Sequence, residues 1–167
     1  MWPERYLEDG YYDKKGYLRR EIIVEHAEEV ADMLAEKELT SATLHRFYNM
    51  VLGIVQKFRT TGEYDRVRPQ IDELEKFAAQ AMKRKASKPA PVEFKQFIQK
   101  NVTLANKSEE GLLGFFQHFQ SVVAFFPNTE GGGPRGNGNS VHRNHESEKH
   151  NSSKKNTSFH KNQSTRR

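Results

Sequence analysis

Apolar residues recur at helical spacing along most of the first 127 residues. In LHRFYNMVLGIVQKF, residues 44–58, they follow the i, i+3, i+4, i+7 pattern of a core-facing helix: Leu44, Phe47, Tyr48, Val51, Ile54, Val55 and Phe58. The run EEGLLGFFQHFQSVVAFF, residues 109–126, has one apolar face made by Leu112, Phe115, Phe116, Phe119, Val122, Val123 and Phe126, with Leu113 and Phe125 elsewhere. A helix that is apolar on more than one side either lies centrally or makes a second interface.

Three further helices are predicted by the same criterion. The first covers residues 20–36, and the quoted helix that follows it has Thr40 or Ser41 as its N-cap. The third begins near Pro69, a residue suited to a first helical turn, and ends in the basic run KRK. The fourth spans residues 92–105, and Ser108 caps the fifth. Because no alternating strand pattern of any length appears, we expect an all-α bundle of about five helices.

The two ends of the chain have other compositions. Residues 1–19 carry one Trp and four Tyr without helical periodicity, which predicts an extended arm that packs its rings on the body. Residues 128–167 contain only Val141 and Phe159 as large apolar residues, too few to offset the entropy of ordering, and we expect them to be disordered. The predicted domains are therefore an arm (1–19), a helical bundle (20–127) and a polar tail (128–167).

The charge is unevenly distributed. The tail holds 8 of the 27 Lys and Arg residues and 3 of the 22 Asp and Glu residues, so the remainder carries 19 of each sign and the net charge of +5 belongs to the tail. The chain has no cysteine, which excludes disulfides and thiolate metal sites. No run approaches the roughly 18 apolar residues that a membrane crossing needs. We expect a soluble, cytoplasmic protein with no membrane partner.

The residues do not favour catalysis. The best candidate is EHAEE, where Glu25, His26 and Glu29 share one helical turn, but the order His-x-x-Glu occurs once and differs from the paired Glu-x-x-His of carboxylate-bridged metal bundles. His45 and His118 have no carboxylate nearby in sequence to orient them, the tail histidines are irregularly spaced, and no phosphate-binding glycine loop is present. We therefore predict no enzyme activity, no metal and no cofactor.

Basic residues form a more suggestive pattern. Arg46, Gly53 and Lys57 share the outward face of the second predicted helix, opposite its apolar stripe. Arg59 lies to one side, and the third helix ends with Lys83, Arg84 and Lys85. Each cation alone is typical of a solvated surface. Together with a glycine, which lets a polymer backbone come near, they predict a surface for a phosphate backbone.

Three stretches resemble one known family: YYDKKGYL at residues 11–18, LTSATLHRFYNMV at 39–51 and above all HFQSVVAFF at 118–126. They are similar to the small subunit of the type III-A CRISPR interference complex, the Csm small subunit, over about residues 10–127. Members of that family usually carry basic residues just before the Phe-Tyr of the second helix. Here that place holds His45 and Arg46, of which only Arg46 is a permanent cation.

The resemblance implies a small, non-catalytic helical bundle that is present in several copies along the guide RNA and target RNA in antiviral defence. Its partners would be both RNAs, other Csm subunits and further copies of itself, and sequence would be read by guide pairing. A rival hypothesis is a protein-interaction bundle that never touches RNA, with the arm and the Leu113, Gly114 and Phe125 side of the last helix holding neighbours. A third, a metal-dependent nuclease, rests only on EHAEE and scattered histidines.

Overall fold

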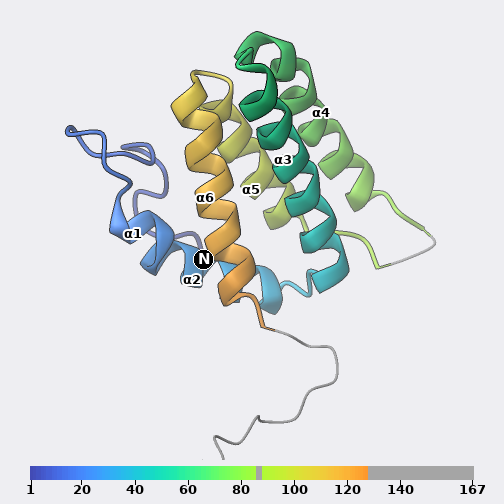
Figure 1. Cartoon of the computed structure of the whole chain (residues 1–167). Coiled ribbons are helices and arrows are strands. Elements are labelled where there is room, and N and C mark those ends of the chain that lie inside the picture. The colour runs from blue at the N-terminus through green and yellow to red at the C-terminus, as the bar shows by residue number, and fades with distance from the viewer. Residues whose placement is uncertain (86–87, 128–167) are drawn as a thin grey trace, which may run out of the picture. The chain divides into compact units, whose positions relative to one another are not determined.

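The computed structural model describes residues 1–85 and 88–127, which contain six α-helices and no β-strand. The helices are α1 (Arg20–Ile23), α2 (Glu25–Glu36), α3 (Ser41–Thr61), α4 (Tyr64–Met82), α5 (Val92–Ala105) and α6 (Glu109–Phe125). Helix α3 packs on α4, α4 on α5, α5 on α6, and α6 back on α3, while α2 packs near the C-terminal end of α6 (Figure 1). The predicted all-α bundle is confirmed. The predicted disorder of residues 128–167 falls outside the described residues.

The helix predicted over residues 20–36 is interrupted. Val24, with φ −119° and ψ −77°, separates α1 from α2. In a continuous helix the carbonyl of Ile22 would accept from the amide of residue 26. Here it accepts a 2.8 Å hydrogen bond from Nδ1 of His118, in α6. The interruption thus frees a backbone acceptor for a buried side chain.

Helix α4 begins at Tyr64, and the predicted start near Pro69 is wrong. The chain leaves α3 through Gly62, whose φ of 69° is in the left-handed region that glycine favours, and α4 follows almost at once. Pro69 lies inside α4 and leaves the carbonyl of Asp65 without its usual amide donor. Tertiary contacts hold the turn that precedes it, because Val67 is buried and the Tyr64 hydroxyl donates to the carbonyl of Ala105.

The other predicted helix starts are confirmed. The side chain of Thr40 accepts a 3.2 Å hydrogen bond from the amide of Thr43, so Thr40 is the N-cap of α3. Ser108 caps α6 by accepting from the amide of Gly111 at 3.0 Å. Helix α5 has the predicted bounds. Such caps typically contribute about 1 kcal/mol each.

The core is rich in phenylalanine. The predicted apolar face of α3 is buried except for the half-buried Tyr48, and that of α6 is buried except for the half-buried Val123. The ring of Phe97 packs edge-on against that of Phe119 with centroids 5.1 Å apart, an arrangement favoured by the ring quadrupoles. The phenylalanines with no or almost no exposed surface are Phe47, Phe94, Phe97, Phe115 and Phe119.

The N-terminal arm packs its rings on this core, as predicted. Tyr6 and Tyr11 are buried, and Tyr11 donates a 2.6 Å hydrogen bond to Oδ1 of Asn101 in α5. The Tyr11 ring lies against Gly114 of α6 so closely that an added Cβ there would be 2.4 Å from the ring. Gly114 is therefore covered by the arm, and the hypothesis that placed it on an outward contact face is wrong for this residue. Tyr17 is the exception among the arm's rings, with 69% of its surface exposed.

Candidate nucleic-acid interface

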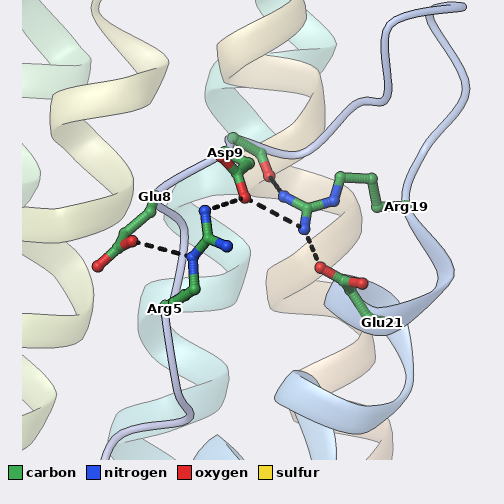
Figure 2. A network of polar contacts seen from close by, with 6 residues as sticks. Arg5, Glu8, Asp9, Arg19 and Glu21 are labelled. Carbon is green, nitrogen blue, oxygen red and sulfur yellow. Dashed lines mark hydrogen bonds and ion pairs between the residues drawn. The ribbon is translucent and has the colours of Figure 1, made fainter.

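Many cations of the described residues are neutralised by neighbouring carboxylates. In the arm, Arg5 donates to Glu8 at 3.3 Å and to Asp9 at 3.0 Å, and Arg19 lies between Asp9 and Glu21 (Figure 2). Exposed pairs of this kind contribute little stability, but they reduce the charge available to a polyanion. The other cations paired in this way are Arg20, Lys37, Arg66, Arg68 and Lys88.

The outward stripe of α3 carries cations without such partners in the described part of the chain. Arg46, Gly53 and Lys57 recur along it, and neither cation pairs with a carboxylate of the described residues. Gly53 and Lys57 are exposed, whereas Arg46 is half-buried with its guanidinium 5.2 Å from the centre of the Phe47 ring. At 1.5 Å per residue, Arg46 and Lys57 lie about 16 Å apart along the helix axis.

A hollow lies beside the first turns of this stripe, between α3 and the last turns of α4. Its volume is 310 Å³, and it is lined by Arg46, Met50, Phe77, Gln80, Ala81 and Arg84. Burial lowers the pKa of the Arg46 guanidinium, and the nearby charge of Arg84 lowers it further. Arginine starts so far above neutral pH that it remains charged. The fold thus brings together two cations that are 38 positions apart in the sequence.

The remaining predicted site residues lie in two places. Lys83 and Lys85 are exposed beside Arg84, where α4 ends and before the undescribed residues 86–87, so they extend the positive charge around the hollow. Arg59 lies on another face of α3, because its guanidinium is 5.7 Å from the centre of the Phe116 ring of α6. Helical geometry gives the same separation, since Arg59 is rotated by well over 90° from Arg46 around the axis.

Gly53 has no packing role within the described residues. A Cβ added there would meet nothing within 4 Å. The other two helical glycines are in close contact: an added Cβ at Gly111 would lie 2.1 Å from the carbonyl oxygen of Leu104, and Gly114 faces the Tyr11 ring. Gly53 therefore lowers helix propensity without permitting any close approach inside the described part of the molecule.

His118 and His45, the histidines considered as catalysts, make hydrogen-bond contacts within the fold. His118 is fully buried between Tyr6 and the carbonyl of Ile22. His45 contacts the carbonyl of Ser41 at 2.9 Å, one turn earlier in α3. In the EHAEE stretch, Glu25 pairs with Arg20. Among the described residues, no three His, Cys, Asp or Glu side chains converge as metal ligands would.

Two features were missed in the sequence. Phe77 lies outside the apolar stripe of α4 and is 37% exposed. Its position on the polar side of that helix was the feature of the sequence that could have indicated this exposure. The buried network of Tyr6, Tyr11, Asn101 and His118 joins the arm to α5 and α6. No local pattern predicts this network, because its two tyrosines lie 90 to 112 positions away from Asn101 and His118.

The described residues form an all-helical bundle, and the hollow between α3 and α4 is lined by two arginines. A comparison with protein families gives a more specific result. The family model described as Csm2 Type III-A matches residues 18–131, and the chain belongs to this family. It is a structural subunit of the type III-A CRISPR complex that assembles with other Csm subunits.

The matched region covers α1 to α6 but starts after Tyr6 and Tyr11, whose hydroxyl groups reach into the core. No curated protein and no solved structure matches the chain. None of the helices in the described part of the chain combines the length and apolar character that a membrane crossing requires.

Proposed function

We propose that this structural subunit is non-catalytic and binds the sugar–phosphate backbone of guide or target RNA in the type III-A complex along the outward stripe of α3. Arg46 and Lys57 would contact phosphates, and Lys83, Arg84 and Lys85 would extend the contact from the end of α4. The single observation that carries this proposal is Gly53, which lies exposed between two cations without a carboxylate partner and has no packing role in the described residues.

Phosphate binding explains this combination of residues. Cations that contact phosphates release condensed counterions, and this release supplies sequence-independent affinity. A glycine removes the side chain that would hold the polymer away from the helix. Because phosphate contacts position a nucleic acid without reading its bases, recognition would be independent of sequence, and guide pairing would supply the specificity.

Arg59 would make a separate contact or none. It lies over Phe116 and away from the Arg46 to Lys57 stripe, so one straight backbone segment along that stripe does not reach it. The absence of catalysis is supported by the structural surroundings of His118 and by the pairing of Glu25 with Arg20.

A second candidate function, protein contact alone, is favoured by one observation. Phe125 is 39% exposed at the end of α6, and Val92 is 48% exposed at the start of α5. Helices α5 and α6 are antiparallel neighbours, so both residues lie at the same end of the bundle. We propose this end as a contact with another subunit or a further copy of this chain, since exposed aromatic and aliphatic side chains are common anchors of protein interfaces.

The test of RNA contact is the double variant Arg46→Ala/Lys57→Ala, assembled into the complex. Alanine suits a helix interior, so the fold should be kept. RNA affinity should fall to a similar degree for unrelated sequences, and the slope of log affinity against log salt should shrink by roughly 0.7 for each single-strand phosphate that is no longer bound. The matched control is Lys14→Ala/Lys15→Ala, which removes the same charge from exposed positions of the arm.

Normal assembly of the Arg46→Ala/Lys57→Ala variant with unchanged affinity and slope would contradict RNA binding by this face. Protein contact alone would then be the better interpretation. An equal loss in the Lys14→Ala/Lys15→Ala control would show that only net charge matters and would contradict a defined surface.

A further inference from the structure

The hollow between α3 and α4 combines charge with an exposed aromatic face. Arg46 and Arg84 line it together with Met50 and Phe77, and Gln80 adds a side-chain amide. Phe77 is among the few large apolar side chains of the described residues that are more than a third exposed. Because 37% of the surface of Phe77 is exposed, part of its ring remains available to an apolar or aromatic ligand.

The arrangement follows from two helical stripes. On α4, Phe77, Gln80 and Arg84 are spaced i, i+3, i+7 and lie on one face, and Arg46 and Met50 of α3 are spaced i, i+4. The short connection at Gly62 makes α3 and α4 antiparallel neighbours, so the beginning of α3 lies beside the end of α4. The hollow therefore continues the α3 stripe at its Arg46 end.

We propose that this hollow holds one unpaired nucleotide of an RNA strand, with the base stacked on Phe77 and the phosphate between Arg46 and Arg84. The inference rests on the proposed contact of α3 with RNA and adds a stacking site to it. Stacking on an aromatic ring is independent of sequence, since every base has a π-face. Only an unpaired, unstacked base can offer that face, so the site would take a single-stranded or splayed-out nucleotide.

Charge and size agree with this occupant. The pKa of Arg46 is lowered by burial and by the charge of Arg84, and a phosphate between the two guanidinium groups would offset both effects. Arginine forks match phosphate oxygens in geometry as well as charge. The volume of 310 Å³ is at the lower end of the range of about 300–1,000 Å³ for small-molecule pockets, which suits one base.

Two strands of equal length, bound to the isolated full-length chain at low salt, separate base stacking from phosphate contact. One is oligouridylate, and the other is an abasic strand with the same number of phosphates. The wild-type chain should bind oligouridylate about tenfold more tightly, as expected for one stacked base. In Phe77→Ala this difference should disappear, because affinity for oligouridylate falls to that for the abasic strand while the salt slopes stay equal. Phe125→Ala, which removes the other exposed phenylalanine of the described residues, should keep the wild-type difference.

A difference that persists in Phe77→Ala, or a wild-type chain that binds both strands equally, would overturn the nucleotide site. Phosphate contact by Arg46 and Lys57 would be untouched by that result, because it is decided by the salt slope of the assembled complex. If Phe77→Ala leaves binding of both strands unchanged but prevents assembly with other subunits, the hollow takes a protein side chain and the proposal is wrong.

Discussion

The hydroxyl group of Tyr6 and Nε2 of His118 lie 2.7 Å apart in the buried core, although 112 positions separate them in the sequence. The other ring nitrogen, Nδ1, lies 2.8 Å from the carbonyl oxygen of Ile22. A carbonyl can only accept, so Nδ1 carries the proton, and in the neutral ring Nε2 accepts from the tyrosine. His118 is thus held as one neutral tautomer that ties the arm and the end of α1 to α6.

This neutral imidazole predicts a pH dependence of stability. Burial is the main cause that lowers the pKa of His118 from 6.5 to about 4, and the nearby His26 lowers it further. Between these pH values the unfolded chain binds more protons than the folded protein. The contribution of His118 to the free energy of unfolding is therefore complete above pH 6.5 and is lost as the pH falls toward 4. The shift corresponds to about 3 kcal/mol of unfolding free energy.

Urea unfolding at neutral pH and at about pH 4 measures this loss, and His118→Gln is the control. Both proteins contain the same carboxylates. The difference between the two proteins in how the free energy of unfolding changes with pH therefore isolates the effect of His118. His118→Gln should be less stable at neutral pH and should lose less stability on acidification. Parallel pH profiles for the two proteins would show that His118 is not held neutral.

Gly53→Ala should stabilise the isolated protein by about 0.5–1 kcal/mol. An added Cβ would meet nothing within 4 Å, and alanine is the better helix former. If RNA approaches this position, the same change should weaken RNA binding, and Gly53→Glu should weaken it more by adding bulk and a like charge. Thermal unfolding and RNA titration of the same samples test both parts. A loss of stability in Gly53→Ala would mean that the glycine has a role in the fold after all.

Gly114→Ala should have the opposite effect on stability. Its Cβ would lie 2.4 Å from the Tyr11 ring, so the arm has to move and the hydrogen bond from Tyr11 to Asn101 is put at risk. Overpacking of this kind typically costs about 1–3 kcal/mol. The melting temperature is the measurement, and Tyr11→Ala combined with Gly114→Ala is the control. Because the double variant has no ring to clash with, the two costs should be less than additive.

Phe119→Ala should destabilise the bundle by about 3–5 kcal/mol, since Phe119 has no exposed surface and its ring packs against Phe97 and Phe115. Phe125→Ala should cost clearly less, because Phe125 is 39% exposed. Chemical denaturation gives both values, and co-purification with other Csm subunits shows whether Phe125→Ala weakens assembly. Equal stability losses with normal assembly would make Phe125 an ordinary core residue.

Removal of the chain after Pro127 should leave helicity and melting temperature essentially unchanged. Phe126 is the last buried side chain of the described residues, and residues 128–167 offer only Val141 and Phe159 as large apolar groups. Circular dichroism of the truncated and full-length chains is the comparison. A melting temperature lower by several degrees would place the domain boundary elsewhere.

The sequence by itself determined the helices and what faces the core. Apolar spacing and caps are local properties, so the buried face of α3, a cap at Thr40 or Ser41, the cap Ser108 and the bounds of α5 could all be predicted. The prediction was wrong where a tertiary contact overrode a local preference. Val24 interrupts a periodic run where the Ile22 carbonyl turns to His118, and α4 extends through Pro69 because the turn before it is held by α5 and the core.

Only the tertiary structure decided how the candidate site is assembled. Gly53 and Gly114 look alike as glycines inside helices, yet one is open and the other is covered by an arm about a hundred residues away. Arg46 and Arg84 line the same hollow, and Phe77 remains partly exposed there, because α3 and α4 pack as antiparallel neighbours. The physical reason is that helix periodicity sets which side a residue faces, whereas the partner on that side depends on packing between segments that are distant in the chain.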